Sequence, residues 1–151
     1  TIILPAILVM SGAPVIGWAK PVPVNPGRMD NPRTDWMWVS LAGPVTNILL
    51  GLLFLLPLKF GIVNAGGFAG EVLIRAFLTN LYLPLFNLIP IPPLDGSRVV
   101  MRFLPYPMME SYARLDGMLG MILIYFLLST HIIDKLLDPL VSVILRALGV
   151  L

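Results

Sequence analysis

The sequence predicts an all-α membrane protein: a multi-pass helical core of about three spans, with a possible short interfacial β-hairpin near the N-terminus. Two observations carry this prediction. Of the 151 residues, 58% are hydrophobic and only 12% are charged, whereas soluble domains average about 25% charged residues. In addition, residues 39–58 include no charged side chain. A helix of that length covers about 30 Å, which is the thickness of the hydrocarbon layer of a bilayer.

Composition also limits the domain organisation and the partners. A soluble domain of this size could not bury so much apolar surface, but lipid-facing side chains need no protein cover. Cysteine is absent, which excludes disulfides and thiolate metal sites, and the net charge of +2 is too small to suggest a nucleic-acid partner. We therefore expect residues 1–151 to form a single domain that is embedded in the lipid bilayer. Because the chain starts without methionine, we also expect it to be N-terminally incomplete.

The first 35 residues predict irregular structure. Residues 1–19 are apolar but broken by prolines and glycines, which suits the end of a membrane segment followed by a turn. In residues 15–24 valines alternate with prolines. Proline cannot donate to a central strand, so only an edge strand or a hairpin at the interface is open to this stretch. Residues 20–35 are polar and predict a solvated loop.

Three membrane spans are expected after this loop. The first covers residues 39–58 and is preceded by Trp36 and Trp38, whose rings favour the headgroup level. The second covers residues 71–90, and the third, residues 117–130, is short unless Ile132 and Ile133 extend it. The tail, residues 134–151, alternates charges with apolar clusters, which predicts an amphipathic or half-inserted helix.

The distribution of basic residues predicts the orientation. Residues 20–35 and 97–116 each include three lysines or arginines, whereas residues 59–70 include only Lys59. Two spans separate the two basic loops, so both lie on one side, and the positive-inside rule makes that side cytoplasmic. We expect a multi-pass protein of a prokaryotic cell membrane with Asp95 toward the cytoplasmic side.

Three polar residues occur in or near the predicted membrane spans, where a polar group without a partner is unfavourable. They are Asn47 in the first span, Asn87 near the end of the second, and Asp95 just beyond it. A carboxylate near the membrane is costly without a partner and is a functional candidate. Each residue also has a structural interpretation. The asparagines could join helices by hydrogen bonds, and Asp95 could cap a helix that starts near Ser97.

The motifs around these residues resemble those of the site-2 protease family of intramembrane zinc metalloproteases. The stretch from Asn87 to Gly96, NLIPIPPLDG, is similar to the family motif N-x-x-P-x-P-x-L-D-G. The stretch from Gly43 to Asn47, GPVTN, is similar to its G-P-x-x-N motif, and residues 17–26 resemble the segment that precedes that helix. Order and spacing agree with the family over residues 1–103.

The resemblance implies a zinc protease that cleaves transmembrane segments of other proteins. In the family, two histidines of H-E-x-x-H and the aspartate of L-D-G bind zinc, so Asp95 is the expected metal ligand. Asn47 and Asn87 match residues expected to bind the substrate backbone. Two histidines at i, i+4 and one carboxylate would leave the fourth zinc position open for water.

The chain departs from the family in one respect that matters for activity. It includes no H-E-x-x-H, and its single histidine, His131, is better explained as an interfacial residue than as a ligand. The resemblance places the missing motif upstream of Thr1, so the chain alone includes no catalytic residue and should be inactive. The alternatives are an inactive family member that only binds transmembrane helices, and a transporter or channel. The transporter alternative is disfavoured by the small number of spans and the absence of a repeat.

Overall fold

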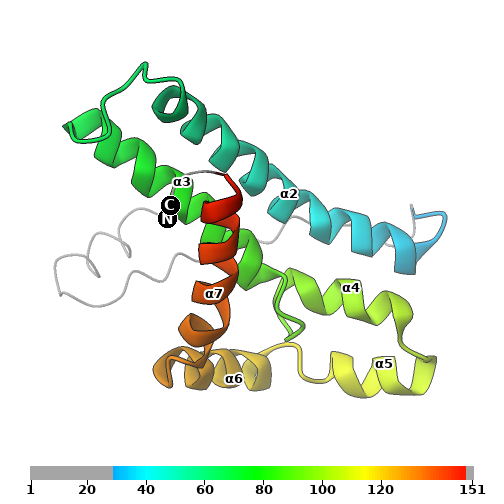
Figure 1. The fold of residues 1–151 in the computed structure, drawn as a ribbon. Helices are drawn as coiled ribbons and strands as arrows, with labels where there is room; N and C mark the ends of the chain where they lie inside the picture. Colours follow the sequence, from blue (N-terminus) through cyan, green and yellow to red (C-terminus); the bar gives the residue numbers. More distant parts are fainter. Residues whose placement is uncertain (1–28, 149–151) are drawn as a thin grey trace, which may run out of the picture.

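A computed structural model describes residues 29–148 of the chain, and in this range every regular element is a helix (Figure 1). The all-α prediction is therefore confirmed for the described range. The predicted hairpin at residues 15–24 lies outside it. The helices are α2 (Pro32–Lys59), α3 (Phe68–Asn87), α4 (Asp95–Phe103), α5 (Tyr106–Ala113), α6 (Met118–Ser129) and α7 (Ile132–Ala147).

Helices α2 and α3 form a long pair that lies side by side (Figure 1). The buried face of α2 is formed mainly of small side chains, which let two helix backbones approach closely. At Gly51 the approach is so close that a Cβ atom there would lie 3.3 Å from the Cβ of Asn80. One turn further along α2, Leu55 packs in a core with Phe77 and Leu81 of α3. The buried residues of α2 are Ser40, Pro44, Gly51 and Leu55.

Helix α7 packs across this pair and confirms the prediction of an amphipathic tail helix. Its buried side chains are Ile133, Leu137 and Val141, which recur every four residues and so lie along one face. The Tyr82 hydroxyl of α3 donates a 3.0 Å hydrogen bond to a carboxylate oxygen of Asp138 on α7. The helix thus adds Val141 to the core between α2 and α3.

The expectation of three spans is not confirmed. By length and composition one described helix, α2, could cross a membrane, and it begins seven residues before the predicted first span. A second candidate arises only if α5 and α6, which are bent by 72° relative to each other, are counted as one. Ile132 and Ile133 do not extend α6, because the chain turns at His131 (φ 54°) and a new helix begins.

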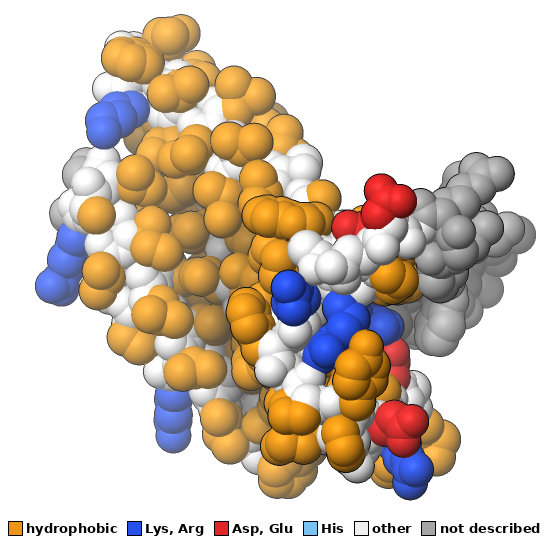
Figure 2. Space-filling model, turned by 90° about the vertical axis from the view of Figure 1, so that its right-hand side faces the viewer, with side chains coloured by type: hydrophobic (Ala, Val, Ile, Leu, Met, Phe, Trp, Pro, Cys, Tyr) orange, Lys and Arg blue, Asp and Glu red, His pale blue; other side chains and the backbone are white. Residues whose placement is uncertain are grey.

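Much of the described surface is apolar. Hydrophobic side chains cover most of the face drawn in Figure 2. Large side chains such as Leu49 and Leu53 of α2 are 62% and 58% exposed. Only 22% of the most apolar window of α2 is buried. A core helix of a soluble protein would be buried over most of its length, so this exposure calls for a partner or a lipid surface.

The contact at Gly51 generates a prediction about stability. Gly51→Val should lower the free energy of unfolding by about 1–3 kcal/mol, because the added methyl groups would overlap Asn80 and push α2 away from α3. Denaturant titration of the detergent-solubilised chain, followed by circular dichroism, measures this loss. Ala42→Val is the matched control, since Ala42 is exposed on the same helix. Equal stability of the two variants would contradict the close crossing.

Candidate functional site

Asp95 lies at the start of α4, directly after a short loop that leaves α3 at Asn87. The loop is closed by three local backbone bonds, in which the amides of Ile91, Leu94 and Ser97 donate to carbonyls two or three residues earlier. The Ser97 hydroxyl also donates to the Leu94 carbonyl at 2.6 Å, and the Ser97 side chain is fully buried. The loop is therefore a compact turn and not an extended connection.

Gly96 fixes this turn against the end of α3. A Cβ atom at Gly96 would overlap the carbonyl of Leu88 and would lie 2.7 Å from the carbonyl oxygen of Ile89. Only a residue without a side chain can approach the backbone so closely. The approach brings Asp95 back beside the carboxyl end of α3, where Asn87 is the last helical residue.

The interpretation of Asp95 as a helix cap is wrong. The capping position of α4 is occupied by Leu94, and Asp95 is the first helical residue, with no capping hydrogen bond from a side chain. The Asp95 carboxylate instead faces α2, where a Cβ atom at Gly43 would lie 3.7 Å from its Oδ2 atom. Burial raises the pKa of the Asp95 carboxyl above its usual value, and the positive charge of Arg98 opposes part of this rise.

The two predicted substrate-binding residues border the same region. Asn47 lies one helical turn beyond Gly43 on α2, so the two share a face of that helix. Asn87 immediately precedes Leu88, whose carbonyl contacts Gly96. Both asparagines are half-buried. Helix packing thus brings the G-P-x-x-N and L-D-G segments together, although they are about fifty residues apart in the sequence.

The described residues supply one candidate zinc ligand and not a complete site. Within residues 29–148 no group of three or more histidine, cysteine, aspartate or glutamate side chains is close enough to hold a metal ion. His131 is exposed at the turn before α7, where its Nδ1 atom lies 2.9 Å from Asp134. A catalytic zinc site needs three protein ligands. Asp95 therefore fits zinc only together with donors from outside the described residues.

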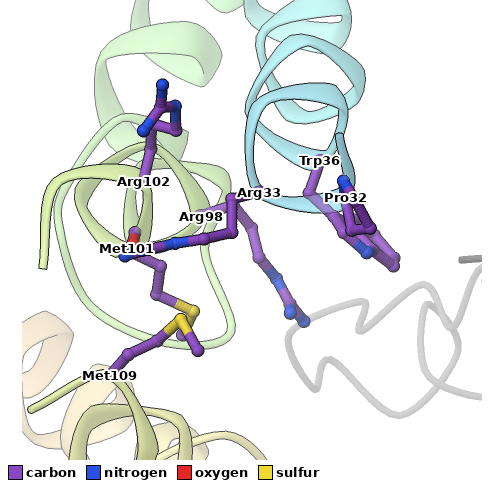
Figure 3. A pocket seen from close by; sticks show the side chains of 7 residues that line it. All are labelled: Pro32, Arg33, Trp36, Arg98, Met101, Arg102 and Met109. Carbon is purple, nitrogen blue, oxygen red and sulfur yellow. Dashed lines mark hydrogen bonds between the residues drawn. The ribbon is translucent and has the colours of Figure 1, made fainter. Parts of the chain in front are cut away.

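A cavity that does not include Asp95 lies between the N-terminal end of α2, α4 and α5 (Figure 3). This cavity of about 210 Å³ is lined by Arg33, Arg98 and Arg102 together with Trp36 and two methionines. Figure 3 shows that the three guanidinium groups point in different directions, so they do not converge on one ligand position.

Two of these arginines are bound to protein partners. Arg33 donates to the main-chain carbonyls of Met101 and Leu104, and its guanidinium lies 4.8 Å from the centre of the Tyr106 ring. Arg98 forms a 2.8 Å ion pair with Asp116 and lies 5.2 Å from the centre of the Trp36 ring.

These arginines thus connect α2 to α4. The sequence did not indicate this role, because residues 97–116 were expected to form a loop. The available signal for a helix in that region was the helical spacing of the apolar residues Val99, Val100 and Phe103.

The chain is similar to proteins named as zinc metalloproteases. It is 39% identical over 103 residues to "Putative zinc metalloprotease YwhC" of Bacillus subtilis, a match that covers 59% of this chain and 44% of that protein. Two proteins of Methanocaldococcus jannaschii also match. "Zinc metalloprotease MJ0392" is 32% identical over 68% of this chain, and "Putative zinc metalloprotease MJ0611" is 39% identical over 41% of it; each match covers 31% of the relative.

The chain therefore spans less than half the length of each of these relatives. No family model matches the chain. No solved structure matches it either. The similarity supports a zinc metalloprotease family.

The two glycines beside Asp95 give a matched pair of substitutions. Gly96→Ala should lower the free energy of unfolding by about 1–3 kcal/mol, because its methyl group would overlap the Leu88 carbonyl. Gly43→Ala should change stability by no more than about 1 kcal/mol, in the stabilising direction, because 3.7 Å is an ordinary contact and alanine favours a helix. Parallel denaturant titrations compare the two. A neutral Gly96→Ala would show that the turn is more open than described.

Proposed function

We propose that this chain belongs to an intramembrane zinc metalloprotease of the site-2 protease type, which cleaves transmembrane segments of other membrane proteins. The observation that carries the proposal is the Asp95 carboxylate, which is half-buried and faces Gly43 of the neighbouring motif helix. The names of the similar proteins support zinc and proteolysis. The intramembrane setting is supported by the exposed apolar surface of α2.

In this proposal Asp95 supplies the third, anionic ligand to a zinc ion whose two histidines come from an H-E-x-x-H segment outside this chain. Zinc bound at such a site lowers the pKa of its water to about 7 and polarises the scissile carbonyl. The Gly96 contact with α3 holds the carboxylate at a fixed position beside α2. Holding a ligand in place before the metal binds avoids an ordering cost.

Asn47 and Asn87 are proposed to bind the backbone of the substrate. A transmembrane substrate has its amides and carbonyls paired within its own helix, so it must unwind before it can be cleaved. A side-chain amide offers both a donor and an acceptor to such freed groups. Asn47 comes from α2, the helix that Asp95 faces at Gly43, and Asn87 is the last helical residue of α3.

The second candidate function is a family member without catalytic activity that only captures transmembrane helices. The absence of H-E-x-x-H from the 151 residues is the observation in its favour. The coding sequence upstream of Thr1 distinguishes the two: an H-E-x-x-H some tens of residues before Thr1 selects the enzyme.

Asp95 is the residue whose substitution tests the enzymatic proposal. In the complete protein, both Asp95→Ala and Asp95→Asn should abolish cleavage of a transmembrane reporter in liposomes and remove the one equivalent of zinc. Asparagine keeps the shape of the side chain but lacks the charge that a two-histidine zinc site needs. Metal analysis of the purified proteins, with this chain alone as the zinc-free reference, gives the second measurement. Full activity of the Asp95→Asn protein would refute the ligand assignment.

The proposed orientation is tested by labelling single cysteines in the cysteine-free chain. A cysteine at Ser111 of α5 should react with a membrane-impermeant maleimide only from the cytoplasmic side. A cysteine at Gly66, in the connection between α2 and α3, should react only from the outside. Both positions are exposed, so a difference in reactivity reports sidedness and not burial. Labelling of Gly66→Cys from the cytoplasm alone would contradict the orientation.

A further inference from the structure

The loop that carries Asp95 is held on a second side by helices α5 and α6. The Tyr112 hydroxyl of α5 donates a 2.5 Å hydrogen bond to the main-chain carbonyl of Pro90. Gly120, the buried residue of α6, lies against the loop at Pro92: a Cβ atom there would overlap the Pro92 carbonyl and would lie 2.5 Å from the carbonyl oxygen of Leu115. Pro92 itself is fully buried.

We propose that Tyr112 and Gly120 are positioning residues that hold the proline loop, and through it Asp95, in place. The catalytic meaning of this role rests on the proposed function, but the mechanical role does not. Gly96 fixes one side of the loop against α3, whereas Tyr112 and Gly120 fix the other side against α5 and α6. Asp95 lies five residues after Pro90 and three after Pro92. Because so few residues separate them, a displacement of either carbonyl group would also displace Asp95.

The physical reason for such a clamp is that the loop can make few hydrogen bonds of its own. Prolines at positions 90, 92 and 93 have no backbone N–H, so only the remaining residues can donate from the main chain. The Pro90 carbonyl therefore takes its donor from the tyrosine of another helix. A displacement of about 1 Å at a catalytic group can lower the rate on the order of a hundredfold. Contacts on both sides of the loop would prevent such a displacement of Asp95.

The clamp also explains why two short helices follow α4. Helices α5 and α6 have 8 and 12 residues and meet at a sharp bend, so neither has the length of a transmembrane helix by itself. Residues 106–129 lie beyond the stretch, 1–103, in which the family motifs occur. Through the contacts of Tyr112 and Gly120, this region would hold the proline loop in place.

Hydrogen exchange of the full chain in detergent tests the mechanical role. Tyr112→Phe removes the donor and keeps the ring, so the Ile91, Leu94 and Ser97 amides should exchange roughly 2- to 12-fold faster. The amides of Leu55 and Phe77 in the α2–α3 core should not change. Tyr125→Phe, which removes the hydroxyl of an exposed tyrosine on α6, is the matched control. Unchanged exchange of the loop amides in Tyr112→Phe would overturn the clamp.

Zinc affinity of the complete protein tests the link to Asp95. Tyr112→Phe and Gly120→Ala should weaken zinc binding about 10- to 100-fold, as loss of the groups that orient a ligand does. In an Asp95→Asn background, where zinc is lost on purification but weak binding to the remaining ligands can be titrated with added zinc, the same changes should alter the affinity less than about twofold, because they act through Asp95. Gly66→Ala is the control for the added methyl group, since its nearest contact is an ordinary 3.5 Å.

The outcomes separate the two proposals. Equal losses of zinc affinity in both backgrounds would show a general effect on folding and overturn the positioning role. A zinc-binding protein that Tyr112→Phe leaves unchanged would overturn it as well. A complete protein that binds no zinc while the loop amides respond to Tyr112→Phe would refute the proposed function and leave the clamp standing.

Discussion

The position of Asp95 depends on the close approach of Gly96 to the carbonyl groups of Leu88 and Ile89. A side chain of any size at Gly96 would push α4 away from the end of α3 and move the carboxylate with it. The approach is possible because the seven residues between α3 and α4 form a compact turn with few donors of its own. The contact of Asp95 with Gly43 and the contact of Pro92 with Gly120 both depend on this turn.

Small side chains also allow the two long helices, α2 and α3, to pack closely. Small side chains at a crossing let two helix backbones approach closely. Gly51 gives α2 that closeness at Asn80 of α3, and the exposed leucines of α2 point elsewhere. On α2, small residues thus face α3 at the crossing and many large apolar residues face outward, while Leu55 packs in the core.

The sequence was informative where the signal is local. An uncharged run of 20 residues is sufficient to predict most of α2, and the amphipathic pattern is sufficient to predict α7. The motifs named Asn47, Asn87 and Asp95, and the structure brings their segments together. The alternative interpretation of Asp95 as a helix cap was wrong because the helix begins at Asp95 itself, one position after the capping residue Leu94.

Contacts between distant residues could not be predicted from the sequence. The bond from Tyr112 to Pro90 joins residues 22 apart, and those of Arg33 to Met101 and Leu104 join residues 68 and 71 apart. No periodicity encodes such pairings. Helix α5 also escaped prediction, because residues 106–113 fell within the expected loop at 97–116.

Helix α2 is secured at each end by a cation from its own terminal turn. Near its start, Arg33 donates to carbonyls at the C-terminal end of α4; in its last turn, Lys59 donates a 3.1 Å bond to the Leu148 carbonyl at the end of α7. Each contact places a positive charge at the negative pole of another helix dipole. The two attachments differ in their response to ionic strength, because Lys59 is exposed and Arg33 is half-buried. Salt would therefore loosen the contact of α2 with α7 before its contact with the C-terminal end of α4.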